Sequence, residues 1–214
     1  MPKFNLRPKP FLYFLVVMYF AGIIGLNASG SREVFISLIP FNLLVTSAIL
    51  FSFHKPWNHR FAMVFLAVAL TGWIAEWIGT STGLLFGDYQ YGEALGFKIA
   101  STPLLIGLNW VLLSYSIWNM LTFFQLRFPF RIIFAVILMV VLDILIEPVA
   151  MDTLMWTWKN DTVPLHNYVG WAGVSFIVFL IWSRYKDMEE NPLAVPVILL
   201  QFLFFAVMNV FLIL

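Results

Sequence analysis

Apolar runs long enough to cross a bilayer recur from one end of this 214-residue chain to the other. A spanning helix needs about 20 apolar residues, and a helix satisfies its own backbone polar groups where no water is present. With 62% hydrophobic and 11% charged residues, the sequence predicts an all-α, polytopic membrane protein with a single integral membrane domain, residues 1–214. We expect about seven transmembrane helices, over residues 11–27, 34–53, 60–79, 99–124, 130–151, 169–184 and 193–214.

Positively charged residues indicate how these spans are oriented. Of the twelve Lys and Arg residues, nine fall on the side of the N-terminus, and Arg32, Lys98 and Lys159 fall on the other side. Because cytoplasmic loops carry the excess of Lys and Arg, we expect a cytoplasmic N-terminus and an outer C-terminus in the inner membrane. The formal charge of +1 gives no reason to expect a nucleic-acid partner. The absence of cysteine excludes thiol catalysis, iron–sulfur clusters and disulfides.

Five acidic residues lie inside or beside the predicted spans: Glu76, Asp88, Asp143, Glu147 and Asp152. A carboxylate in hydrocarbon costs several kcal/mol unless something offsets it, so such residues usually serve a function. At 1.5 Å per residue, Asp143 lies about 20 Å and Glu76 about 24 Å from the cytoplasmic start of their helices. Glu147 lies one turn beyond Asp143 on the same face. These three carboxyl groups are therefore expected to meet in the outer half of the bilayer.

Two connections, residues 80–98 and 152–168, are predicted to lie over this cluster on the outer side. The first combines glycines with aromatic residues, and the second carries tryptophans, a proline and a histidine. Neither is long enough for a separate domain. Because non-helical backbone at membrane depth persists only over protein or a cavity, we expect two interfacial loops that cap a pocket in the outer half of the bilayer.

Aromatic and polar residues at the same depth complete the predicted pocket. Trp73 and Trp77 share one helix face with Glu76, and Asn109 with Trp110 lies at a depth that overlaps that of the acids. Few cations are predicted nearby, so repulsion and desolvation should keep at least one acid protonated beside an ionised neighbour. That is the arrangement of a general acid next to a general base.

The buried acids also allow roles that involve no acid–base catalysis. Asp143 and Glu147 could hydrogen-bond neighbouring helices or the carbonyl groups freed at Pro148, and membrane carboxylates also serve proton or cation transport. A metal site built from Glu76, Asp143, Glu147 and His166 is a further alternative. The chain has only three histidines, two of them predicted on the cytoplasmic side, so no metal site is predicted.

Two long motifs cover the connections and the helices that lead into them. The first is Glu76-x-x-Gly79-x-x-Thr82-Gly83-x-x-Phe86-Gly87-x-Tyr89-x-Tyr91. The second is Asp143-x-x-x-Glu147-Pro148-x-Ala150, followed by Trp156-x-Trp158 and by Asn167-Tyr168-x-Gly170-Trp171. Together these motifs cover about residues 73–171, and they resemble the membrane carotenoid hydratases. Those enzymes belong to the carotenoid biosynthesis protein family, which includes the bacterioruberin and γ-carotene hydratases.

The resemblance implies water addition across the terminal double bond of an acyclic ψ-end group, with a lycopene- or γ-carotene-like substrate in the lipid bilayer and no cofactor. Such hydration protonates a carbon atom and leaves a tertiary carbocation that water captures. It needs a desolvated acid, aromatic faces that stabilise the cation, and a second carboxylate that holds the water. We expect Asp143 to be the acid and Glu147 or Glu76 to hold the water. Asp88 and Asp152 would orient the surrounding shell or admit water.

The expected substrate-binding residues are the aromatic and polar residues of the motifs and of the predicted pocket: Trp73, Trp77, Tyr89, Tyr91, Asn109, Trp110, Trp156, Trp158, Asn167 and Trp171. The sequence that precedes Asn167, Val163-Pro164-Leu165-His166, departs from the family pattern. This departure leaves the role of His166 open.

Two competing functions remain. A membrane lycopene cyclase or another prenyl-lipid enzyme would use similar acid chemistry but would exclude water. A proton-coupled carrier would use the same carboxylates, yet the chain lacks internal repeats, and its first, second, sixth and seventh predicted spans place almost no acid in the cytoplasmic half. Association with other carotenoid enzymes also stays open.

Overall fold

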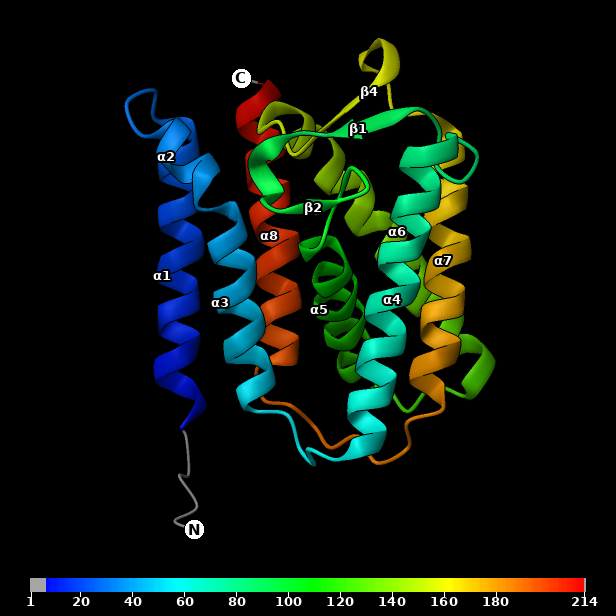
Figure 1. Ribbon diagram of the computed structural model, residues 1–214. Helices are drawn as coiled ribbons and strands as arrows, with labels where there is room; N and C mark the ends of the chain where they lie inside the picture. Colours follow the sequence, from blue (N-terminus) through cyan, green and yellow to red (C-terminus); the bar gives the residue numbers. More distant parts are fainter. Residues whose placement is uncertain (1–6, 214) are drawn as a thin grey trace.

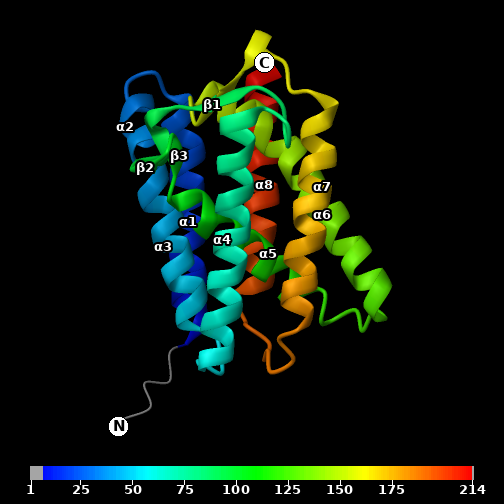
Figure 2. The same cartoon turned by 45° about the vertical axis from the view of Figure 1, so that its right-hand side comes forward.

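The computed structural model describes residues 7–213, which form a bundle of roughly parallel helices capped at one end by short strands (Figures 1 and 2). Helix α5 lies at the centre of the bundle, in contact with α3, α4, α6, α7 and α8. The α-helices of this described part are α1 (Pro8–Asn27), α2 (Arg32–Ser37), α3 (Ile39–Ser52), α4 (His59–Thr82), α5 (Leu105–Met120), α6 (Phe128–Asp152), α7 (Leu165–Ser183) and α8 (Ala194–Ile213).

Five of these helices, α1, α4, α6, α7 and α8, are long and apolar enough to cross a membrane, so the chain is a membrane protein. The expected count of seven full spans is not confirmed. Helix α3 has 14 residues and α5 has 16. At 1.5 Å per residue they measure about 21 and 24 Å, which is short of the roughly 30 Å hydrocarbon core.

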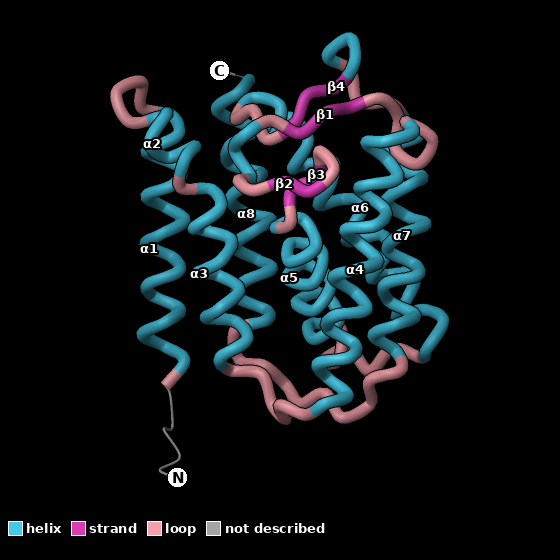
Figure 3. The backbone as a smooth tube through the Cα atoms, in the orientation of Figure 1, coloured by secondary structure: helices cyan, strands magenta, loops and turns pink. Residues whose placement is uncertain are grey.

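Local sequence explains why both of these helices are short. The expected span 34–53 is divided at Leu38, because Pro40 stands in the first turn of α3 and cannot donate a backbone hydrogen bond to the turn before it. The expected span 99–124 starts as a hairpin, in which β2 (Lys98–Ile99) pairs with β3 (Thr102–Pro103). The hairpin takes the place of the outer part of that span, so α5 begins below it (Figure 3).

The two connections predicted as caps pair with each other across the top of the bundle (Figure 3). Strand β1 (Tyr89–Tyr91) runs antiparallel to β4 (Trp156–Trp158), with Tyr89 opposite Trp158 and Tyr91 opposite Trp156. Side chains alternate between the two faces of a strand, so the first and last residue of each strand are buried and the middle one is exposed. Four aromatic rings therefore point from the cap into the bundle. The 3-10 helices η1 (Glu93–Leu95) and η2 (Lys159–Asp161) follow the two strands.

At the end of the bundle opposite the strands, a buried polar network ties two loops to three helices. The Nδ1 of His54 lies 2.9 Å from the hydroxyl of Tyr115, and the His54 ring stacks on Phe61 with the ring centroids 3.5 Å apart. Asn191 donates from Nδ2 to the same hydroxyl at 3.1 Å and to the carbonyl oxygen of Leu50 at 2.8 Å. Burial lowers the pKa of His54 to about 4, so this imidazole is neutral in the folded protein at neutral pH.

His54 should make the stability of the fold depend on pH. In the unfolded chain its pKa returns to about 6.5, so between pH 6.5 and pH 4 the unfolded state binds more protons than the folded state. The free energy of unfolding should fall as the pH falls through this window, by up to about 3 kcal/mol. Thermal unfolding of the detergent-solubilised protein at pH 7 and pH 4.5 measures this change. His54→Phe keeps the ring stack and should lose most of the difference; an unchanged pH dependence would contradict this role.

Candidate active site

Three carboxyl groups are buried together beneath the paired strands. Glu76 comes from α4, and Asp143 and Glu147 come from successive turns of α6. Their relative exposures are 3%, 0% and 2%. Within residues 7–213, every ion pair involves other acids, so no Lys or Arg neutralises any of the three. Neutral hydrogen-bond donors must therefore stabilise this cluster.

Strand β1 supplies two of the three donors to Glu76, and α5 supplies the third. The hydroxyls of Tyr89 and Tyr91 donate to its Oε2 at 2.6 and 2.7 Å, and the indole Nε1 of Trp110 donates to its Oε1 at 3.1 Å. Burial, followed by the neighbouring Glu76 charge, raises the pKa of both tyrosines well above the usual value, so both remain donors. Glu76 is thus surrounded by three donors, an environment that suits an ionised carboxylate.

Strand β4 supplies the donors to Glu147 in the same way. The indole Nε1 atoms of Trp156 and Trp158 donate to its Oε2 at 2.9 and 2.7 Å. The register of the cap therefore matters: each strand offers two buried aromatic donors, and each pair bonds one glutamate. A shift by one residue would turn all four rings away from the acids.

Asn167 connects the two acids of α6. Its Nδ2 donates to Asp143 Oδ2 at 2.8 Å and to Glu147 Oε1 at 3.2 Å. The other oxygen of Asp143, Oδ1, is buried and has no hydrogen-bond partner in the part of the chain that the structure describes. A bare carboxylate oxygen in such a place is costly. Asp143 and Glu147 thus form an acid pair that a single amide bridges.

Two tryptophans form a stacked wall next to the carboxyl groups. The rings of Trp110 and Trp171 lie 4.4 Å apart between centroids, with an angle of 24° between their planes. Gly72 of α4 makes room for this stack, since a Cβ atom there would lie 2.4 Å from the Trp110 ring. The wall provides the broad π face that a cation prefers.

A cavity of about 20 Å³ lies between the two glutamates. A single ordered water needs about 10–15 Å³ of such space and two to four polar partners. Seven of the ten predicted substrate-binding residues line this cavity together with Glu76 and Glu147: Tyr89, Tyr91, Asn109, Trp156, Trp158, Asn167 and Trp171. Asp143 lies behind Asn167 and does not line it. The site therefore has room for one water between two carboxyl groups.

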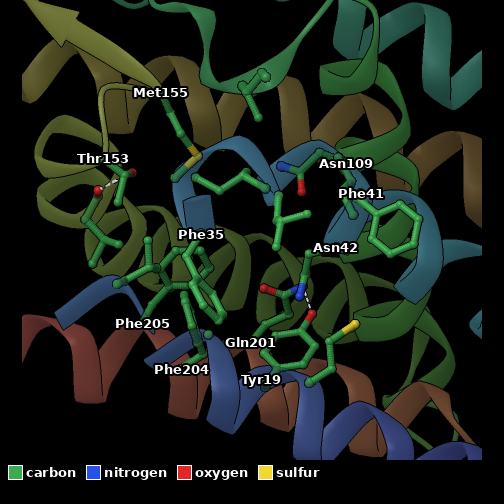
Figure 4. Close-up of a pocket in the computed structure, with 18 of the residues that line it drawn as sticks. Tyr19, Phe35, Phe41, Asn42, Asn109, Thr153, Met155, Gln201, Phe204 and Phe205 are labelled. Atoms are coloured by element: carbon green, nitrogen blue, oxygen red, sulfur yellow. Dashed lines mark hydrogen bonds between the residues drawn. The ribbon is translucent and has the colours of Figure 1, made fainter. Parts of the chain in front are cut away.

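A second, larger cavity of about 390 Å³ adjoins the small one (Figure 4). Its walls come mainly from α1, α3, α5, α6 and α8, and almost all of its lining is apolar. Four residues line both cavities and thus form the boundary between them: Ile106, Asn109, Ile146 and Trp156. Ile106 and Ile146 carry no sequence signal of this role, because an isoleucine in an apolar span is ordinary.

Two of the five predicted catalytic acids lie away from the cluster. Asp88 is exposed and pairs with Lys159 at 3.1 Å. Asp152 pairs with Arg32 at 2.6 Å across 120 positions of sequence. The sequence predicts few cations near the five acids, and these two acids each have one. Each ion pair joins segments that are remote in the sequence, which spacing alone does not reveal.

Trp73 and Trp77 also lie outside the pocket. Their rings stack with centroids 6.3 Å apart, Trp77 is 41% exposed, and neither residue lines either cavity. Trp110 contacts Glu76 without lining the small cavity. The ring of His166 bonds the carbonyl oxygen of Leu84 at the surface, away from the three carboxyl groups. Within the described residues, no group of three or more His, Asp or Glu side chains is arranged to hold a metal ion.

Comparison with known protein families gives a match over most of the chain. Residues 34–214 match the family model described as carotenoid biosynthesis protein. The match covers well over half of the chain and includes all three buried carboxyl groups and both paired strands, whereas α1 lies outside it. No curated protein and no solved structure shows a significant match to the chain.

Proposed function

Because the chain belongs to the carotenoid biosynthesis protein family, we propose that it is a hydratase that adds water to the terminal double bond of an acyclic carotenoid end group. The observation that carries this proposal is the water-sized cavity between Glu76 and Glu147, which shares a wall with a large apolar cavity. Water and an alkene are the two reactants of a hydration. The site offers adjoining spaces of the right polarity for both.

The acid pair would supply the proton. A proton of the Asp143 and Glu147 pair passes to the less substituted carbon of the terminal double bond, the π bond breaks, and the positive charge appears on the neighbouring tertiary carbon. Glu147 is the member of the pair that lines the cavity, so it makes the transfer, and repulsion between two buried like charges keeps a proton on the pair. The depth of Asp143 along α6 favours Asp143 as the direct proton donor. In the fold, however, Asp143 lies behind Asn167, and this position favours Glu147 as the donor instead.

Glu76 would hold and activate the water. Its three donors favour the ionised form, and an ionised carboxylate accepts a hydrogen bond from water and then its proton. The water oxygen bonds to the cationic carbon as that proton leaves, which gives a tertiary alcohol with one water added in total. Trp156 lines both cavities, and Trp158 and Trp171 line the smaller one. These aromatic rings would stabilise the transient cation. No redox step is involved.

Mass analysis of the pigments made in a lycopene-producing bacterial host tests this function. We expect a product heavier by one water, and in deuterated water a product that keeps one deuterium on carbon beside the new alcohol. Asp143→Asn should lower its yield at least about tenfold, since general acid–base groups contribute 10²–10⁴-fold. The same assay is run with γ-carotene. An isomer of unchanged mass would indicate cyclisation instead. If both lycopene and γ-carotene are recovered unmodified, the proposal is contradicted.

A further inference from the structure

The lining of the large cavity reaches the outside of the bundle at α1 and α3. Its lining includes residues that are themselves exposed on that side: Val17 of α1 is 66% exposed and Phe41 of α3 is 59% exposed. Both are apolar, and α1 and α3 are neighbours in the bundle (Figure 1). In a membrane this side faces lipid tails, so a hydrophobic molecule in the bilayer can reach the cavity without passing through water.

The interior of the cavity suits a long apolar chain. Its volume of about 390 Å³ lies within the range of about 300–1,000 Å³ that small-molecule sites occupy. One of its polar contacts is satisfied internally, because Gln201 donates from Nε2 to the hydroxyl of Tyr19 at 2.8 Å. Figure 4 shows this pair on one side of the cavity and Met155 with Asn109 on the other. A hydrocarbon can therefore fill the space without leaving that donor unpaired.

The inner end of the cavity leads to the carboxyl groups. Trp156 and Asn109 belong to both cavities, and Trp156 also donates to Glu147. The small cavity has room for a water but not for a branched end group. A chain that fills the large cavity must therefore stop at this boundary, with its last double bond on the apolar side and water on the other side.

We propose that this cavity is the binding site for the acyclic isoprenoid chain of the substrate, which enters sideways from the bilayer between α1 and α3. The proposal rests on the proposed function and adds the location and route of the substrate. It also gives α1 a specific role. This helix lies outside the residues that match the family, yet it forms one wall of the cavity and thereby sets how wide a chain can enter.

Gly22 of α1 offers a direct test, because it lines the cavity and a Cβ atom there would lie only 3.4 Å from the Phe204 ring. Gly22→Phe should fill the cavity and lower the amount of lycopene bound to the purified protein at equilibrium by at least about tenfold, which corresponds to about 1.4 kcal/mol. The matched control is Gly173→Phe. Gly173 lies on α7, where nothing stands within 4 Å of an added Cβ, so binding should be unchanged.

A second measurement covers the case in which Gly22→Phe fails to fold. The chain has no cysteine, so Val17→Cys places a single thiol at the opening of the cavity. Lycopene should slow its reaction with a maleimide at least about threefold, whereas Ile177→Cys on the exposed face of α7 should react at the same rate with and without lycopene.

The outcomes separate this inference from the proposed function. If lycopene binds to the wild type, binds less to Gly22→Phe and is never hydrated, the binding site is supported and the proposed hydratase activity is contradicted. Equal binding to wild type and Gly22→Phe, or an equal loss in Gly173→Phe, would overturn the binding site. Absence of protection at Val17→Cys in a protein that hydrates lycopene would overturn the route between α1 and α3.

Discussion

Replacing Glu147 with Gln is expected to lower the rate of hydration by about 10²–10⁴-fold, the range that a general acid contributes. The amide has nearly the same shape as the carboxyl group but cannot release a proton to carbon. It also keeps a carbonyl oxygen that can accept from Trp156 and Trp158, which bond the present Oε2 at 2.9 and 2.7 Å. The variant should therefore fold, bind lycopene and make almost no alcohol.

The measurement is the initial rate of alcohol formation per amount of folded protein, with bound lycopene determined in the same samples. Glu93→Gln is the matched control. Glu93 is an exposed acid that pairs with Lys98 at the surface, and the same substitution there should leave the rate unchanged. A Glu147→Gln enzyme with more than about a tenth of the wild-type rate would show that Glu147 does not transfer the proton.

Replacing Gly92 with Ala is expected to separate the two strands of the cap and to inactivate the enzyme. Gly92 follows β1, and its N–H donates to the carbonyl oxygen of Met155 at 2.9 Å. A Cβ atom at this position would lie 2.1 Å from the carbonyl oxygen of Leu154. That atom belongs to the backbone and cannot turn aside, so the strands must move apart.

The consequence reaches both glutamates, because the cap carries their donors. Displacement of Tyr91 and Trp156 would weaken one hydrogen bond to Glu76 and one to Glu147. We expect a loss of about 1–3 kcal/mol in the free energy of unfolding, as for other overpacked sites, and a fall in hydration rate of at least about 10²-fold, since small misplacements of catalytic groups have effects of this size.

Thermal unfolding and the hydration assay measure the two effects. Gly30→Ala serves as the control, because nothing lies within 4 Å of a Cβ atom added at Gly30, and it should be neutral in both assays. Wild-type activity in Gly92→Ala would contradict the view that the paired strands hold the two glutamates in place.

Much of this arrangement can be predicted from the amino-acid sequence, for physical reasons that act locally. A spanning helix is recognisable from its length and apolarity alone, and a carboxyl group inside it stands out because burial is so costly. Glu76, Asp143 and Glu147 are identifiable in this way, and counting residues along two helices places them at one depth. The two glycine- and aromatic-rich connections are predicted as caps, and their pairing as β1 and β4 agrees with that.

The side that each residue of a helix faces depends instead on how the helices pack. In a soluble protein the polar face of a helix marks the side exposed to water, but a helix in lipid is apolar all round. Trp77 is therefore equivalent in sequence to the aromatic residues of the pocket, although it lies on the exposed side. The same ambiguity conceals the cavity walls formed by Ile106 and Ile146.

The sequence alone thus establishes a membrane protein with buried acids beneath a cap, because hydrophobicity and the cost of a buried charge are properties of single segments. Which acids remain without cations emerges only in the folded chain. Lys159 reaches Asp88 and Arg32 reaches Asp152, while four of the donors to Glu76 and Glu147 come from two strands that meet only in the fold. Contacts between distant segments depend on how helices pack and rotate, and no local property of the chain specifies that.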